Sequence, residues 1–147
     1  MCLSYCEIFL KSVLVLSVKL LLADQDGIHF INTDAEEQEQ VKDTHGHIMS
    51  VNYDYDTQSL FYSQSDFDSD TNNIVKLNLI TNEVKTILNF IHGDVKQISV
   101  DWVTKKLYFI NQQRKRIEVC NFDGSQRRVL FMNLGMPTSI SVIPYLG

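Results

Sequence analysis

The sequence predicts an all-β protein, and two observations carry that prediction. Segments of strand length, either alternating in polarity or rich in β-branched and aromatic residues, follow one another between short polar links. One such run consists of residues 96–102, 106–111, 115–121 and 126–131. Over residues 20–147 no apolar pattern with the 3.6-residue period of a helix continues for the length of a helix.

An internal repeat indicates how these strands are arranged. Residues 49–64 and 98–111 both begin with an apolar residue, followed by Ser-Val, an Asp or Asn, and an aromatic residue. Both then have a polar turn and a leucine followed by two aromatics. Residues 74–79 match residues 117–122 at an offset of 43, and Ile140-Ser-Val142 restarts the pattern at an offset of 42. Four short strands that recur at this spacing are the signature of a β-propeller blade.

We expect two full blades, at about residues 47–94 and 95–137, within a partial propeller that covers residues 20–147. Before them, residues 20–24 and 28–32 are predicted as the second and third strands of a partial blade. After them, residues 139–143 are predicted as the opening strand of a fourth blade.

The two full units differ in length at two places. The first unit is two residues longer between Val51 and Leu60, and four residues longer between Gln64 and Ile74. We place both insertions at turns, where added length costs little free energy. Six blades of about 40–45 residues need about 240–270 residues. We therefore expect part of a six-bladed propeller, which as an isolated chain exposes unpaired strands and aggregates or binds hydrophobic dye.

Residues 1–19 form an apolar segment whose status stays open. Glu7, Lys11 and Lys19 interrupt it, and the charge-free run of residues 12–18 is far shorter than a membrane span requires. Its early acid and its internal lysine also make it a poor signal peptide. The alternative is a start that does not belong to the propeller.

Composition and motifs exclude several classes of function. A net charge of −5 argues against a nucleic-acid binder, which needs a clustered basic excess. Three cysteines are too few for a disulfide framework, and Cys120 lies in an apolar strand pattern where it is expected to pack as a small hydrophobe. The sequence has no nucleophile elbow, zinc-ligand spacing or phosphate-binding glycine loop, so we predict no enzyme and no cofactor.

Residues 100–111, 116–124 and 127–130 together resemble the class B (YWTD) repeat of the low-density-lipoprotein-receptor family. The YWTD tetrad reads Phe61-Tyr-Ser-Gln64 in one copy and Tyr108-Phe-Ile-Asn111 in the other. The residues that carry the repeat motif are Phe61, Tyr62, Asn78, Asp101, Trp102, Leu107, Tyr108, Phe109, Asn111, Asn121, Asp123 and Gly124.

The resemblance also implies roles for two of these positions. In the family the acid of the tetrad takes part in polar contacts that tie the repeats together. Gln64 and Asn111 carry no charge, so we expect the ties between blades to be weaker here. Trp102 follows Ile98 and Val100 on one strand, and we expect it to be largely buried.

For function, the resemblance implies a non-enzymatic extracellular scaffold that binds proteins. The expected parent is an endocytic or signalling receptor ectodomain, with modules similar to epidermal growth factor beside the propeller and a lipoprotein-like or secreted protein as ligand. Alternatives are a secreted matrix propeller of nidogen type and a truncated product without independent function. A lactonase-like enzyme is disfavoured, because the innermost strands, residues 47–52 and 97–101, offer only isolated polar side chains.

Two polar clusters have a functional and an ordinary interpretation. Asp66, Asp68 and Asp70 are spaced as in a calcium loop, but Thr71 and Leu77 stand where an EF-hand needs Gly and Glu. A lengthened, solvated hairpin turn explains them better. His45 and His47 lie near acidic residues and can titrate between extracellular and endosomal pH, or they are ordinary loop histidines.

Two charged runs have similar alternatives. Residues 114–116, together with Arg127 and Arg128, form either a basic face for an acidic ligand or a solvated turn. The acidic run of residues 34–43 is expected to be an outer strand and its loop, whose charges discourage pairing with another chain.

Overall fold

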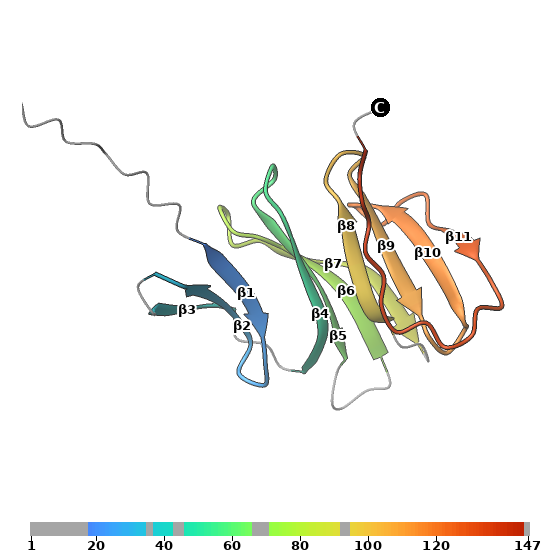
Figure 1. Cartoon of the computed structure of the whole chain (residues 1–147), viewed down its shortest axis with the longest axis horizontal. Helices are drawn as coiled ribbons and strands as arrows, with labels where there is room; N and C mark the ends of the chain where they lie inside the picture. The colour runs from blue at the N-terminus through green and yellow to red at the C-terminus, as the bar shows by residue number, and fades with distance from the viewer. Residues whose placement is uncertain (1–17, 35–36, 43–45, 66–70, 92–94, 146–147) are drawn as a thin grey trace, which may run out of the picture.

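The computed structural model describes residues 18–34, 37–42, 46–65, 71–91 and 95–145. Within these ranges all regular secondary structure is β-strand, so the predicted all-β class is confirmed. The strands form three antiparallel sheets that follow one another along the chain and lie side by side (Figure 1).

Each sheet is a simple meander in chain order. The first sheet contains β1 (Lys19–Ala23), β2 (Ile28–Asn32) and β3 (Glu37–Lys42). The second contains β4 (His47–Asp54), β5 (Ser59–Ser65), β6 (Thr71–Asn78) and β7 (Val84–Ile91). The third contains β8 (Val95–Asp101), β9 (Lys106–Asn111), β10 (Arg116–Asn121) and β11 (Arg128–Phe131).

Among the described residues, the first sheet has no counterpart of β4. In chain order β3 precedes β4 as β7 precedes β8, the first strands of the next sheets, so β3 corresponds to the outermost strand β7. Counting back along the meander, β1 and β2 are the second and third strands of their sheet, as predicted. The strand part of the acidic run, Glu37–Lys42, is the outer strand β3, which is also as predicted.

The two-residue insertion is not at a turn, and that expectation is wrong. Asp54 pairs with Ser59, and Asp101 pairs with Lys106, so both hairpins have four-residue loops. The bulge in each pair also falls at the corresponding place, at Met49 in β4 and at Lys96 in β8. Strand β4 therefore matches β8 at an offset of 47 residues, not at the 49 suggested by the Ser-Val match. Because the side-chain period of a strand is two, a slip of two residues keeps every side chain on its face and hides the error.

The four-residue insertion is where it was predicted. Gln64 pairs with Asn73 and Asn111 with Arg116, so the link from β5 to β6 is four residues longer than the one from β9 to β10. Residues 66–70 of that link, including Asp66, Asp68 and Asp70, lie outside the described residues.

Alternation along β5 sends its side chains into two separate cores. Leu60 and Tyr62 face the first sheet, where they form a cluster with Ile28, Val75 and Leu77. Phe61 faces the third sheet and is fully buried in a second cluster. The other buried members of that cluster are Ile74, Val95, Ile98, Val100, Leu107, Phe109 and Cys120. The hydrophobic stabilisation is thus concentrated at the two junctions between sheets.

Residues 139–143 do not form a regular strand, yet they run along β8 (Figure 1). The backbone N–H of Ile140 donates to Gln97 Oε1 at 3.1 Å, and that of Val142 donates to Ser99 Oγ at 3.0 Å. The segment therefore lies beside β8 much as β8 lies beside β4.

Candidate protein-binding surface

Neighbouring hairpin turns form one end of the second and third sheets, at the upper edge of Figure 1. Each turn is fixed by the aspartate that ends the preceding strand. Asp54 accepts hydrogen bonds from the Thr57 backbone N–H at 3.1 Å and from its hydroxyl at 2.6 Å. Asp101 accepts from the backbone N–H groups of Val103 and Thr104, each at 3.0 Å. These side chains hold both turns in the same conformation.

Lys105 links the two turns across the junction of the sheets. Its Nζ lies 3.1 Å from Asp54 Oδ1 and 2.7 Å from Asp56 Oδ2. The Asp54 side chain is fully buried. Burial opposes its ionisation, but the hydrogen bonds from Thr57 and Lys105 outweigh that effect and hold the pKa of Asp54 below its usual value. A charge-assisted tie between sheets therefore exists, although not at the tetrad.

The innermost strands add further ties. Ser50 Oγ on β4 accepts from the backbone N–H of Ile98 at 3.2 Å, and the Asn52 amide donates to the Ile98 carbonyl at 2.9 Å. Ser50 and Asn52 occupy the same positions on β4 as Gln97 and Ser99 on β8. Side chains on the inner strands thus supply ties at this junction in addition to the contact of Lys105 with Asp54.

The tetrad position of the third sheet makes its contacts within that sheet. Asn111 accepts from the backbone N–H of Arg114 at 3.1 Å and donates to Glu118 Oε1 at 3.4 Å. Glu118 is 1% exposed and lies 2.8 Å from both Arg116 Nε and Arg127 Nε. Burial opposes ionisation of Glu118, but Arg127 and Arg116 outweigh it and hold the pKa of this carboxyl below its usual value.

The Glu118 contacts also revise the expected basic face. Two of its five members, Arg116 and Arg127, bind a buried carboxylate, while Arg114, Lys115 and Arg128 remain exposed. Part of the expected basic face is therefore structural.

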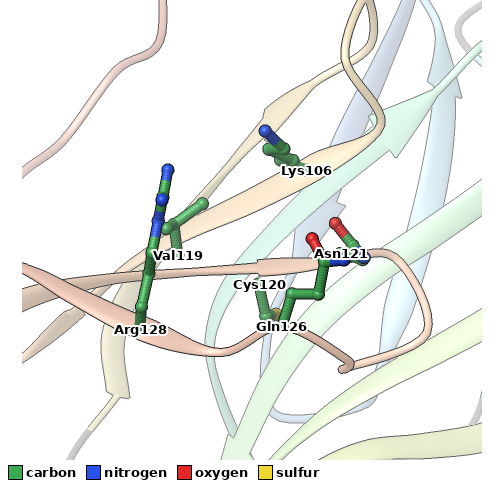
Figure 2. Close-up of a pocket in the computed structure, with 6 residues that line it drawn as sticks. All are labelled: Lys106, Val119, Cys120, Asn121, Gln126 and Arg128. Atoms are coloured by element: carbon green, nitrogen blue, oxygen red, sulfur yellow. The ribbon is translucent and has the colours of Figure 1, made fainter.

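A small cavity of about 120 Å³ lies on the third sheet (Figure 2). Lys106 and Arg128 extend to the same side, whereas the Cys120 side chain points away from both. Cys120 is 1% exposed, and burial raises the pKa of its thiol from 9.0 to about 11. It packs as a hydrophobe, as predicted, and a thiol so rarely ionised is a poor nucleophile.

Trp102 is 51% exposed, so its expected burial is wrong. Strand β8 ends at Asp101, and Trp102 is the first residue of the turn. At the structural offset its counterpart is Tyr55, also the first residue of a turn and 76% exposed. The prediction had extended the strand of Ile98 and Val100 one residue too far, to Trp102, whereas β8 ends at Asp101.

Two half-buried aromatic residues on strands, Phe30 on β2 and Tyr53 on β4, lie next to the turn residues. We call the four residues Phe30, Tyr53, Tyr55 and Trp102 the turn-end surface. The rings of Phe30 and Tyr53, and of Tyr53 and Tyr55, meet edge to face with centroids 6.3 Å apart. Aromatic side chains in such numbers at an exposed position are typical of protein-binding surfaces.

Two open hollows lie on either side of the Tyr53 and Tyr55 rings. One, of about 470 Å³, is mainly apolar, and its lining residues are Lys19, Leu21, Phe30, Tyr53, Tyr55, Gln58 and Leu79. The other, of about 270 Å³, is lined by Tyr53, Tyr55, Asp56 and Trp102.

The remaining residues of the predicted repeat motif lie in the two cores, at the ends of strands or in turns. Phe61, Tyr62, Leu107 and Phe109 are buried in the two cores, and Tyr108 is half-buried. Asn78 and Asn121 end the third strands of their sheets: Asn78 accepts from the backbone of Ile80 and Thr81, and Asn121 donates to Ser125. In the turn after Asn121, Asp123 accepts from the Ser125 backbone, and Gly124 adopts a φ of +86° with the Ile87 carbonyl 2.6 Å from where a Cβ would lie.

Sequence reasoning missed one tetrad. Strand β1 is the second strand of its sheet, so Leu21-Leu-Ala-Asp24 occupies the tetrad position and Asp24 is its acid. Asp24 Oδ1 lies 3.1 Å from Nε2 of His29, which is 5% exposed on β2. The three changes at Leu21, Leu22 and Ala23, from aromatic and Thr residues, concealed the motif, and only its aspartate could have revealed it.

Neither metal nor histidine hypotheses gain support here. Within the described ranges, no three His, Cys, Asp or Glu side chains are placed to hold a metal ion. His45 lies outside those ranges, and His47 is exposed at the start of β4. No helix with the length and apolar character of a membrane span occurs in the described part of the chain.

The fold and the repeated polar positions define part of a β-propeller. Over 51 residues, 34% of the chain, the sequence is 43% identical to low-density lipoprotein receptor-related protein 5 of Mus musculus. Over 98 residues, 65% of the chain, it is 33% identical to the vitellogenin receptor of Solenopsis invicta. The matches span only 3% and 5% of those two proteins. No family model matches the sequence.

Solved structures agree on the fold. The chain is similar to one in the crystal structure of a nidogen/laminin complex, with a TM-score of 0.68, 23% identity, and coverage of 78% of this chain and 44% of that one. Enzymes share the fold too, among them an oligogalacturonate lyase in complex with manganese, at a TM-score of 0.57 and 13% identity over 71% of this chain and 29% of that one. Sequence and fold together support a class B repeat propeller of the low-density-lipoprotein-receptor type, as the repeat motifs predicted.

Proposed function

We propose that this chain is a non-enzymatic, extracellular protein-binding scaffold and that the turn-end surface is its docking face. The observation that carries the proposal is the exposure of Trp102 and Tyr55 at corresponding positions of two adjacent turns, next to half-buried Tyr53. Large aromatic residues held at the surface by rigid turns supply contact area at a low cost in conformational entropy.

Rigidity supports the same conclusion. Asp54 and Asp101 fix the conformation of the turns, and Lys105 joins one turn to the other. A preorganised surface loses little entropy when a partner docks, so more of the contact energy remains as affinity.

The sequence relatives favour a receptor ectodomain, with a lipoprotein-like or secreted protein as partner and modules similar to epidermal growth factor beside the propeller. A secreted matrix propeller of nidogen type is the second candidate, favoured by the similarity to a chain of the nidogen/laminin complex. Both candidates place the chain outside the cell and use it to bind a protein.

Selection from a phage-displayed library of random peptides tests the docking face. The immobilised chain is expected to enrich convergent sequences, whose synthetic peptides lose binding to the double variant Tyr55→Ser, Trp102→Ser. Tyr145→Ser, which removes an aromatic side chain that is 83% exposed elsewhere, is the control and should bind normally. Enriched peptides that bind the double variant as well as the parent chain would place the docking face elsewhere, and a library without enrichment would reject the function.

A further inference from the structure

The hollow between the second and third sheets has an unusual lining. Three of its four residues are aromatic, Tyr53, Tyr55 and Trp102, and the fourth is Asp56. The faces of aromatic rings attract cations, Trp most strongly, and desolvation by neighbouring rings strengthens the attraction. A carboxylate beside such rings supplies the countercharge.

The charge balance around this hollow is negative. Asp54 and Asp56 share the single ammonium group of Lys105, so these three side chains together carry an excess of one negative charge. Partial burial disfavours the charged form of Lys105, but its hydrogen bonds to Asp56 and Asp54 outweigh this and hold its pKa above the usual value. The ammonium group of Lys105 therefore stays charged, and the carboxylate of Asp54, whose pKa is lowered, stays ionised at neutral pH.

Asp56 is positioned to take a second cation. Its side chain is 62% exposed, and only its Oδ2 atom contacts Lys105. Oδ1 makes no hydrogen bond or ion pair with any described residue, so it can accept one from a ligand that enters the hollow.

We propose that the hollow lined by Tyr53, Tyr55, Asp56 and Trp102 binds a basic side chain, arginine or lysine, presented by the partner protein. The inference rests on the proposed function, since it names the chemistry by which the turn-end surface recognises its partner. The adjacent apolar hollow of about 470 Å³ shares the Tyr53 and Tyr55 rings and holds Lys19, which makes it the poorer site for a cation.

Trp102 is the single tryptophan of the chain, so intrinsic fluorescence reports on this hollow directly. The probes are acetyl-arginine amide and its neutral isostere acetyl-citrulline amide. We expect a saturable change in Trp102 fluorescence with the arginine probe, at least about fivefold weaker binding of citrulline, and weaker arginine binding at high salt. Equal binding of the two probes, or binding of neither, would overturn the proposal.

Two variants that change the local charge should change the binding of the arginine probe in opposite directions. Asp56→Asn should weaken binding of the arginine probe about three- to tenfold, whereas Lys105→Met, which frees both carboxylates, should strengthen it about twofold or more. Asp26→Asn, the same charge change at the distant β1–β2 turn, is the control and should change nothing. Unchanged circular dichroism without ligand shows that each variant is folded, and an Asp56→Asn variant that binds like the parent rejects the site.

The peptides selected from the library separate this inference from the proposed function. Peptides that depend on Tyr55 and Trp102 but lack arginine and lysine would uphold the docking face and reject the basic ligand. A response to acetyl-arginine amide without any enriched peptide would uphold the cation site and reject the protein-binding function.

Discussion

The second and third sheets repeat one chain pattern but stabilise the end of their second strand differently. In the third sheet Asn111 contacts the buried Glu118 on the neighbouring strand, and two arginines hold that carboxylate. In the second sheet Gln64 occupies the position of Asn111, and the residue that corresponds to Glu118 is the apolar Val75.

The first sheet shows a third solution at the same place. There the tetrad keeps its acid, Asp24, and its cross-strand partner is His29, which corresponds in register to Glu118. The negative charge has moved from the second strand to the third between these sheets. Comparing the tetrads position by position suggests that the third sheet has lost its negative charge. The charge is instead kept on the neighbouring strand, where the two side chains occupy nearly the same space.

The largest expected effect on stability comes from replacing equivalent leucines in the two cores. Leu60 and Leu107 are the second residues of the equivalent strands β5 and β9, and both are fully buried. Leu60 packs at the junction of the first and second sheets, whereas Leu107 packs at the junction of the second and third. Each change to alanine should lower the free energy of unfolding by about 2–5 kcal/mol through lost burial and cavity formation. Leu107→Ala should cost more, because its cluster has more fully buried members.

Urea unfolding followed by circular dichroism measures both variants, with the slope checked for change. An equal or larger loss for Leu60→Ala would show that the junction with the three-stranded first sheet is packed as tightly as the other.

The second effect concerns Glu118. Replacing it with Gln leaves Arg116 and Arg127 without their shared carboxylate and should cost about 1–3 kcal/mol at neutral pH. Since the pKa of Glu118 is lowered in the folded chain, its stabilisation is complete above the usual value of 4.5 and is lost as pH falls below it.

The difference in unfolding midpoint between the parent chain and Glu118→Gln should therefore be constant above pH 4.5 and shrink in more acidic buffer. The exposed Glu83→Gln is the control for the change in net charge. A difference that persists unchanged into acid would mean that Glu118 stabilises the sheet by packing and not by its charge.

Features that depend on residues close together in the sequence could be predicted, whereas features that depend on distant residues could not. The strands, the turns and the longer link before Ile74 arise from nearby residues and were predicted. The offset of 47 residues was missed, because strand periodicity makes a two-residue slip look equally good. The end of β8 was placed one residue too late, and Trp102 was therefore expected on a buried strand when it lies in the turn.

The contacts of the candidate site could not be predicted in this way. The contact of Lys105 with Asp54 joins residues 51 positions apart, and it exists only because β8 packs beside β4. The Glu118 network requires knowing which residues of β9 and β10 face each other. Burial of Cys120 was predicted correctly, since its apolar neighbours on the strand were sufficient to show it.

The third effect tests the tie between the second and third sheets. Lys105→Met should lower the free energy of unfolding by about 1 kcal/mol, because the Lys105 side chain is 37% exposed and solvent screens part of its attraction to the buried Asp54. Lys115→Met is a matched control: both lysines have a left-handed backbone, with φ of 55° and 49°, but Lys115 is exposed in the β9–β10 turn. Equal losses in urea unfolding would show that the tie contributes nothing.

The smallest expected effect on stability is that of Trp102→Ala. A core tryptophan at this position would cost about 3–5 kcal/mol on truncation, from lost burial and the cavity left behind. Trp102 instead stands half in solvent at the head of a turn whose conformation is fixed by Asp101 and not by the indole. We expect a loss of about 1 kcal/mol or less, similar to that of the equivalent Tyr55→Ala, measured by urea unfolding followed by circular dichroism. A loss above about 3 kcal/mol for Trp102→Ala but not for Tyr55→Ala would show that Trp102 belongs to the buried strand and that the two turns are not equivalent.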